Sequence, residues 1–153
     1  MENKSSTHDR ELLISRTLDA PVELVWEVWT KPEHIAQWWG PEGFTNTIHT
    51  MNVEPEGEWE FIMHAPNGAN FKNRSIFKEV VPFKKIVYEH VVHPWILATI
   101  TFEERGEQTH LTWHMLFESA EEFMKVIKAH NAAEGQKQNV IKLAAYLEGL
   151  KNR

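Results

Sequence analysis

The stretch that decides the fold is PVELVWEVWT at positions 21–30, read together with the motif Trp38-Trp39-Gly40-Pro41 that follows it. In the first segment, apolar residues recur at helical spacing and form a single stripe. The second segment ends a short helix, because Gly40-Pro41 prevents its continuation. Two adjacent tryptophans at such a helix end predict that one ring turns into an interior that needs filling.

Length and composition indicate one globular domain. The chain has 153 residues, enough for a hydrophobic core of its own. Its 42% hydrophobic and 25% charged residues match an ordinary soluble protein, so we expect a single domain over 11–151 after a flexible tail at 1–10. Seven tryptophans and eight phenylalanines depart from the average. Such rings either fill a thick core or line an apolar pocket.

Charge and cysteine content exclude several classes of function. A formal charge of −6 argues against nucleic acid or an anionic membrane as the main partner, since both require a basic surface. The absence of cysteine excludes disulfides, thiol catalysis and thiolate metal sites. The polar start carries no signal peptide pattern, and the longest apolar run is too short for a membrane span. We therefore expect a cytoplasmic protein.

The N-terminal part reads as a strand followed by two short helices. The strand begins at 12–14 and runs to about Leu18. Pro21 is typical of a first helical turn, where its missing N–H costs nothing. Thr30 and Glu33 have the spacing of a capping box, so a second helix is predicted to begin with Thr30 as its N-cap and to end near Trp38.

The rest of the chain predicts a sheet and a C-terminal helix. From Phe44 to Phe117 the apolar residues alternate with polar ones and are interrupted by short turns, which indicates about six strands in an antiparallel meander. A second capping box at 119–122 opens a helix that Gly135 is expected to interrupt. After it, an amphipathic helix runs to about Leu150. This helix is expected to cover the apolar face of the sheet.

The order of elements and several motifs resemble the START-like (SRPBCC) superfamily over residues 11–150. Within it, the chain is similar to the branch related to the C-terminal domain of activators of the ninety-kilodalton heat-shock protein's ATPase. The resemblance implies an α+β helix-grip fold, also seen in birch-pollen allergen: a curved antiparallel sheet of six to seven strands around a long C-terminal helix, with two short helices after strand one. The motifs that carry it are Asp19-Ala20-Pro21, Val25-Trp26, Thr30-Lys31-Pro32-Glu33, Trp38-Trp39-Gly40-Pro41, Gly43-Phe44-Thr45, Trp59-Glu60-Phe61, Pro66-Asn67-Gly68, residues 77–82, residues 109–113 and Tyr146-Leu147.

Two positions depart from the pattern of this branch. Where many relatives carry Asp-Leu-Arg-Pro-Gly-Gly, this chain reads Asn-Val-Glu-Pro-Glu-Gly at 52–57, so an anion contact from the arginine is lost. Where relatives often have Gly-Trp at the start of the last helix, Gly135 is followed by Gln136. An amide in place of an indole is expected to leave the interior larger and more polar at that end.

The sharpest functional hypothesis is an internal cavity for a small apolar molecule, between the concave sheet and the long helix. The alternative is that the same side chains interdigitate and leave no room. Strand alternation places wall residues on the sheet, with two rings near the mouth and three residues on the helical side. The candidate ligand-binding residues are Trp39 and Phe44 at the mouth, Trp59, Phe61, Met63, Tyr88, His90, Trp113 and Met115 on the sheet, and Phe123, Gln136 and Val140 on the helices.

His90 is the histidine singled out, because it shares strand parity with Ile86 and Tyr88 and should face the apolar side. It could orient a ligand or shuttle a proton, or it could simply bond a neighbouring group. The other histidines do not suggest a metal site: His110 and His114 lie ~13 Å apart along an extended strand. No nucleophile elbow, phosphate loop or dinucleotide fingerprint is present. We expect no metal, no cofactor and no catalytic residue.

The sequence therefore predicts a binding protein for a small apolar or amphipathic molecule, as a monomer or homodimer, rather than an enzyme. Two alternatives come from the resemblance. One is a co-chaperone-like module of the stress response that contacts a heat-shock ATPase. The other is a pocket enzyme of the cyclase or dehydratase kind.

Overall fold

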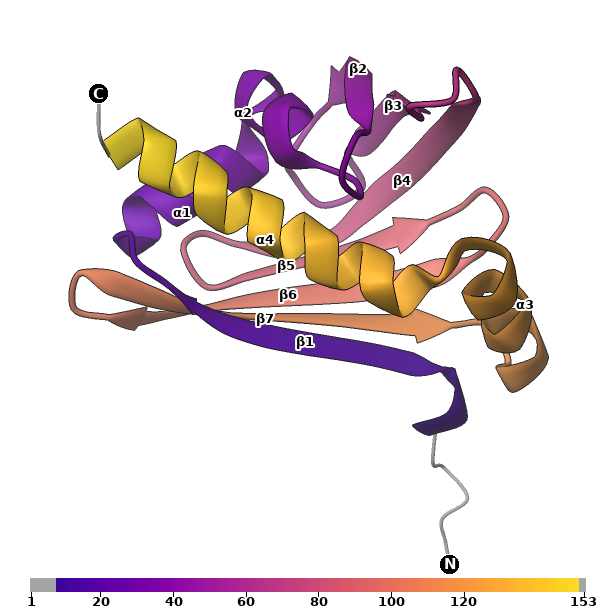
Figure 1. Ribbon diagram of the computed structural model, residues 1–153. Coiled ribbons are helices and arrows are strands. Elements are labelled where there is room, and N and C mark those ends of the chain that lie inside the picture. Colours follow the sequence, from indigo (N-terminus) through magenta and orange to yellow (C-terminus); the bar gives the residue numbers. More distant parts are fainter. Residues whose placement is uncertain (1–7, 152–153) are drawn as a thin grey trace, which may run out of the picture.

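The computed structural model describes residues 8–151, and it shows one curved seven-stranded sheet with helices on its concave side (Figure 1). The sheet order is β1-β7-β6-β5-β4-β3-β2 with every neighbouring pair antiparallel. The predicted α+β helix-grip fold is thereby confirmed. The strands are β1 (Glu11–Leu18), β2 (Thr45–Met51), β3 (Glu58–His64), β4 (Asn70–Val81), β5 (Lys85–His90), β6 (Ile96–Arg105) and β7 (Gln108–Phe117).

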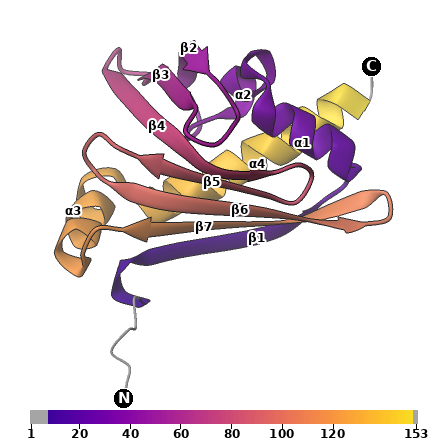
Figure 2. The same ribbon diagram turned by 180° about the vertical axis from the view of Figure 1, so that it is seen from behind.

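The helices occupy three places around the sheet. The two short helices lie beside one end of α4, and α3 lies at its other end (Figures 1 and 2). The long α4 crosses the concave face of the sheet, as the amphipathic pattern predicts. No helix of the described residues is long and apolar enough to span a membrane. The helices are α1 (Val22–Thr30), α2 (Pro32–Trp38), α3 (Ala120–His130) and α4 (Ala132–Lys151), and a short 3₁₀ turn, η1 (His8–Arg10), precedes β1.

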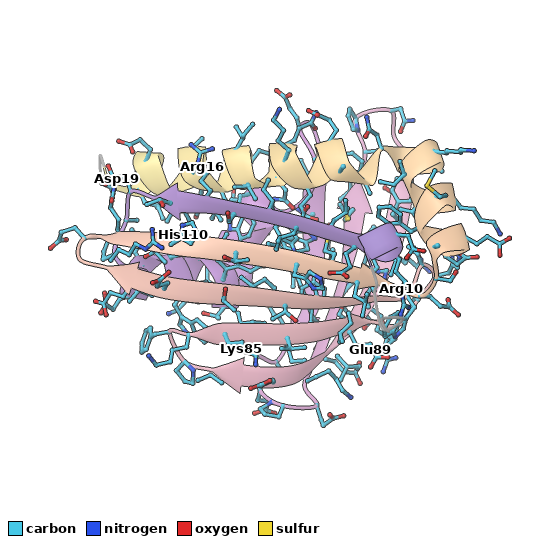
Figure 3. The ribbon with its side chains drawn as sticks, turned by 90° about the horizontal axis from the view of Figure 1, so that it is seen from below. Arg10, Arg16, Asp19, Lys85, Glu89 and His110 are labelled. Carbon is cyan, nitrogen blue, oxygen red and sulfur yellow. The ribbon has the colours of Figure 1, made fainter. Side chains whose placement is uncertain are left out.

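Strand alternation decides which side chains reach the concave face. On β7 the inward set includes Thr109, Leu111 and Trp113, all buried, while His110 and His114 face outward. On β5 the inward positions are those of Ile86, Tyr88 and His90, and Lys85 and Glu89 take the opposite parity; Figure 3 labels the last two. The register shifts between Ile48 and Thr50 and between Phe77 and Glu79. Such bulges bend strands, so they help to curve the sheet toward α4.

Two local expectations about helix ends need correction. Thr30 does not cap α2: its hydroxyl donates to the Trp26 carbonyl at 2.8 Å inside α1, and Lys31 is the N-cap. The break expected at Gly135 lies at Asn131, which adopts the left-handed conformation, so Gly135 lies within α4. An asparagine tolerates that backbone conformation and therefore ends a helix as glycine does.

Of the predicted tail at 1–10, the structure describes only residues 8–10. Residues 8–10 form η1, and the guanidinium of Arg10 donates to the carbonyls of Phe117 at 3.2 Å and Glu118 at 2.8 Å. Residues 1–7 lie outside the described part. At the other end of the fold, Lys151 of α4 pairs with Asp19, which follows β1, at 3.0 Å. Figure 3 labels Asp19. The second capping box is half formed, because the Ser119 hydroxyl accepts from the backbone N–H of Glu122.

The turn between β2 and β3 needs unusual backbone conformations. At Gly57 a Cβ would lie 2.0 Å from the carbonyl oxygen of Asn52, so no larger residue fits there. Its neighbour Glu56 has φ 69°, a left-handed conformation that a glycine adopts without steric cost. The backbone of Glu56 is therefore strained, although its side chain is exposed and makes few contacts that depend on this conformation.

Replacing Glu56 with glycine should stabilise the fold. The relief of left-handed strain outweighs the weak exposed ion pair with Lys78, so we expect Glu56→Gly to raise the free energy of unfolding by ~0.5–1 kcal/mol. Urea denaturation measures the change. The matched control is Glu54→Gly in the same turn, where φ is not positive and added chain entropy should make the variant equal or less stable. A loss of stability in Glu56→Gly comparable to the control would contradict the strain argument.

Candidate ligand-binding site

The large rings of the interior form a continuous cluster centred on Trp39. Its ring centroid lies 4.9 Å from Trp59, 5.3 Å from Trp113 and 6.3 Å from Tyr88. Trp39 is buried rather than placed near a mouth, which corrects the expected position of that ring. These rings therefore pack against one another. The open space of the interior lies beside this cluster and does not pass through its centre.

An inner chamber of about 260 Å³ adjoins this cluster. It is bounded by strands β3 to β7 on the sheet side and by the first turns of α4 on the other. Aromatic and apolar side chains make up most of its wall, as in small-molecule sites generally. The lining residues are Trp39, Gly40, Pro41, Trp59, Phe61, Met63, Asn73, Ser75, Tyr88, His90, Pro94, Ile96, Trp113, Met115, Ala132, Gly135, Gln136 and Asn139.

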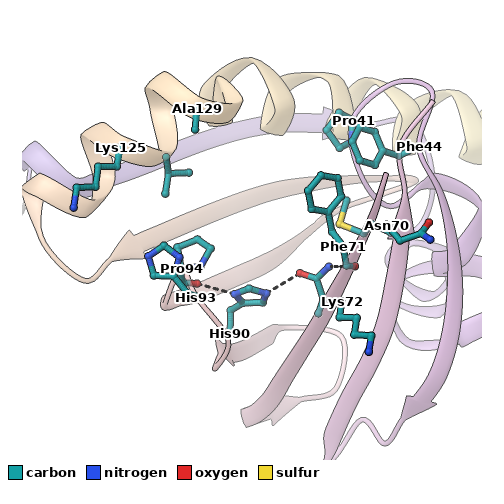
Figure 4. A pocket seen from close by; sticks show the side chains of 13 residues that line it. Pro41, Phe44, Asn70, Phe71, Lys72, His90, His93, Pro94, Lys125 and Ala129 are labelled. Atoms are coloured by element: carbon teal, nitrogen blue, oxygen red, sulfur yellow. Dashed lines mark hydrogen bonds between the residues drawn. The ribbon is translucent and has the colours of Figure 1, made fainter. Parts of the chain in front are cut away.

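A wider vestibule of about 570 Å³ lies outside the chamber. Lys125 and Ala129 reach it from α3 on one side, and Pro41, Phe44 and Phe71 reach it from the opposite side (Figure 4). The two spaces have five lining residues in common, so they form one site with an inner and an outer compartment. The shared residues are Pro41, Met63, Asn73, His90 and Pro94.

His90 stands at the throat between the two compartments, with both ring nitrogens in short hydrogen bonds (Figure 4). Nδ1 lies 2.7 Å from the carbonyl oxygen of Pro94, and Nε2 lies 2.7 Å from Oδ1 of Asn73. The amide nitrogen of Asn73 in turn donates to the carbonyl of Phe71 at 3.0 Å. The ring is therefore held between its own strand β5, the neighbouring strand β4 that carries Asn73, and the loop that carries Pro94.

The protonation state of His90 is coupled to the orientation of Asn73. With two acceptors facing it, a protonated ring donates from both nitrogens. A neutral ring donates from Nδ1 to Pro94, and its Nε2 lone pair is then satisfied only if Asn73 turns its NH₂ group inward and gives up the bond to Phe71. Burial nevertheless lowers the pKa of His90, while the carbonyl of Pro94 opposes that shift.

This lowered pKa makes a prediction for pH dependence. The unfolded chain takes up the proton near the ordinary value of 6.5, whereas folded His90 does so only at lower pH. The contribution of His90 to stability is therefore present above 6.5 and is lost as the pH falls toward the folded pKa. Imidazole resonances of His90 followed by NMR should titrate below those of the same protein in denaturant. A midpoint at or above the denatured one would show that the two acceptors outweigh burial.

Polar groups inside the chamber are few. Tyr88 is 5% exposed, and burial raises the pKa of its phenol, which therefore remains a neutral hydroxyl. The indole N–H of Trp113 lies near this hydroxyl, but it forms no hydrogen bond with the hydroxyl or with any other group of residues 8–151. Ser75 adds a second hydroxyl to the wall. These two groups are available to orient a ligand in an otherwise apolar space.

Three side chains of α4 hold the segment 38–44 over the chamber. Asn139, 4% exposed, accepts from the backbone N–H of Gly40 at 3.0 Å and donates to the carbonyl of Trp38 at 2.8 Å. Gln138 accepts from the N–H of Glu42 at 3.1 Å. Lys142 donates to the carbonyl of Pro41 at 3.1 Å, and burial lowers the pKa of its ammonium. The tryptophan pair is thus fixed to the C-terminal helix.

The family description "Activator of Hsp90 ATPase homolog 1-like protein" matches residues 19–148, most of the chain. The chain belongs to this family. A search of curated proteins found no match. Membership confirms the superfamily that the motifs indicate, and it supplies the coarse expectation of a ligand-binding domain.

Solved structures of similar fold come from several bacteria. A protein of Nitrosomonas europaea superposes with a TM-score of 0.85 at 24% identity, over 95% of this chain and 98% of that one. A protein of Arthrobacter aurescens gives 0.86 at 22% identity, over 94% and 89%. An AHSA1-like protein of Aeromonas hydrophila gives 0.72 at 16% identity, over 93% and 96%. At these identities the likeness concerns the fold.

Most candidate residues of this family member lie around the two compartments. Phe123 and Val140 line neither space: Phe123 packs on Phe117 at 5.2 Å in a separate cluster, and Val140 belongs to the main core. Phe44 lines only the vestibule, whereas Met63 and His90 line both spaces. The candidate residues that line the inner chamber are Trp39, Trp59, Phe61, Met63, Tyr88, His90, Trp113, Met115 and Gln136.

Sequence reasoning missed the polar and loop residues of the site. Ser75 and Asn73 share the inward parity of β4, so the alternation that located Tyr88 could have found them. Asn139 lies one turn after Gln136 on the same helix. Pro94 could not be found in this way, because it reaches the throat from an irregular loop. Gln136 itself donates to the carbonyl of Trp113 at 3.2 Å, which pins the first turn of α4 to β7.

Proposed function

We propose that this family member binds a small hydrophobic molecule in the inner chamber and has no catalytic role. The observation that carries the proposal is the 260 Å³ space beside a fully packed aromatic cluster. Aromatic and apolar side chains line most of this space, as they do in small-molecule sites generally, and this lining supports a binding role. Ligand sites generally measure about 300–1,000 Å³. The ligand is therefore compact, or it extends into the vestibule.

The geometry of the polar groups favours binding over catalysis. Both nitrogens of His90 face Pro94 and Asn73 at 2.7 Å, so a ligand in the chamber has no direct contact with either nitrogen. The phenol of Tyr88 is neutral and acts as a hydrogen-bond partner rather than as a base. These groups orient a ligand that the rings enclose.

Binding of naphthalene-2-methanol tests the proposal, because this neutral probe combines a flat apolar body with one hydroxyl. Isothermal titration calorimetry should show saturable binding at one site, and the thermal midpoint should rise with probe concentration. Native mass spectrometry of protein from its own cells should show a retained small molecule. Absence of saturable binding, for this probe and for a panel of apolar compounds of similar size, would refute the proposal.

The family description raises a second candidate, a module that contacts a heat-shock ATPase. The proposal assigns the site to a small molecule, and a pull-down with the ninety-kilodalton chaperone distinguishes the two. A specific complex that changes ATP turnover, together with failure of the binding experiment, would transfer the function to the chaperone.

A further inference from the structure

The charged side chains of the vestibule all have the same sign. Lys72 and Lys125 line it, together with the titratable His90 and His93, and no aspartate or glutamate is among its lining residues. The whole chain has the opposite balance, with 22 acidic residues against 16 lysines and arginines. A basic opening on an acidic protein is a local feature that needs an explanation of its own.

Neighbouring carboxylates neutralise only part of this charge. Glu122 accepts from His93 at 2.8 Å and pairs with Lys125 at 3.4 Å. Lys72 forms no ion pair within residues 8–151. Lys72 and Lys125 point away from His90 in Figure 4, so their long side chains act at the rim of the opening. Lys125 is shared between Glu122 at 3.4 Å and Glu121 at 4.0 Å, so Lys72 is the lysine of the vestibule that has no carboxylate partner among residues 8–151.

Burial lowers the pKa of His90, so the ring adds positive charge to the throat only where a neighbouring group favours its protonated form. His90 already has an acceptor at 2.7 Å from each ring nitrogen, so its protonated form requires no rearrangement. An anion in the vestibule favours that form, because opposite charges at short distance stabilise each other. By contrast, the chamber beyond the throat offers apolar surface and the hydroxyls of Tyr88 and Ser75, a poor environment for a charge.

Resting on the proposed function above, we propose that the ligand is an anionic amphiphile: its apolar, ring-sized body occupies the chamber, and its carboxylate or similar anionic group lies in the vestibule near Lys72. The division into an apolar inner and a basic outer compartment fixes this orientation. A neutral molecule of the same shape uses only the inner half of the site.

Matched probes test this assignment: 2-naphthoate, naphthalene-2-methanol and naphthalene-2-methylamine share one apolar body and differ in charge. At low salt the carboxylate should bind ~3–10-fold more tightly than the alcohol, and the amine should bind most weakly. Raising the salt from ~50 mM to ~500 mM should remove most of the difference, because the lysines are exposed. The double variant Lys72→Gln/Lys125→Gln should lose the preference and keep its affinity for the alcohol.

The matched control is Lys128→Gln, one turn further along α3, whose side chain is exposed and lies outside the vestibule lining. It should leave the carboxylate preference unchanged. Equal affinity for the three probes, or an equal effect of Lys128→Gln and the double variant, would overturn the assignment and leave the proposed function standing. Binding of none of the probes would instead count against the proposed function.

Discussion

The variant Asn139→Ala should lose ~2–4 kcal/mol of stability, because it leaves two buried backbone groups without partners. The N–H of Gly40 and the carbonyl of Trp38 both depend on this one amide, and both residues are buried. The carbonyl belongs to the last turn of α2, where no intrahelical donor remains. Chemical denaturation gives the free energy difference.

Gln138→Ala is the matched control for this loss. Gln138 is the preceding residue of α4, and it bonds the N–H of Glu42 in the same segment, but that bond is exposed. Water replaces the lost amide there, so the cost should be below ~1 kcal/mol. A loss in Asn139→Ala no larger than that in Gln138→Ala would show that the Trp38–Gly40 segment is held by ring packing rather than by α4.

The variant Ser75→Leu should reduce affinity for naphthalene-2-methanol by at least ~tenfold while the protein stays folded. Ser75 is buried in the middle of β4 and lines the inner chamber, so the added apolar atoms enter space that the ligand otherwise fills. Filling a void with apolar atoms also contributes ~0.5–2 kcal/mol of stability in favourable cases. Equal or higher stability together with lost binding is therefore the expected pair of results.

Thr101→Leu makes the same type of change on the exposed outer face of β6 and should leave binding unchanged. Calorimetry with both variants measures the contrast. Undiminished binding in Ser75→Leu, with an intact fold, would place the ligand outside the inner chamber and would contradict the account of the site.

The fold could be predicted from the sequence because its signals are local and repeated. Alternation on β3 and β7 placed Trp59 and Trp113 inward, and the motif at 38–41 marked the end of α2. Helix ends were harder to predict, because they depend on contacts that the sequence does not show. The hydroxyl of Thr30 bonds backward into α1 instead of forward, and Asn131 rather than Gly135 adopts the left-handed conformation.

The candidate site could be predicted only in outline. Parity shows which side chains point inward, but it does not show whether they meet. Trp39 was expected near a mouth and lies at the centre of the ring cluster, because Asn139 pulls its backbone against α4. Phe123 was expected in the cavity and packs on Phe117, because α3 turns away at Asn131. Which part of the interior stays open therefore depends on where the helices end, and strand periodicity cannot supply that information.

A crystal soaked with 2-bromonaphthalene would examine the interior most directly, since anomalous scattering locates the bromine independently of the protein density. The account predicts one occupied position bounded by Tyr88, Trp113 and Met115, with the surrounding rings unmoved. Bromine found only on the outer surface, with those side chains closed over the space between sheet and helix, would contradict it.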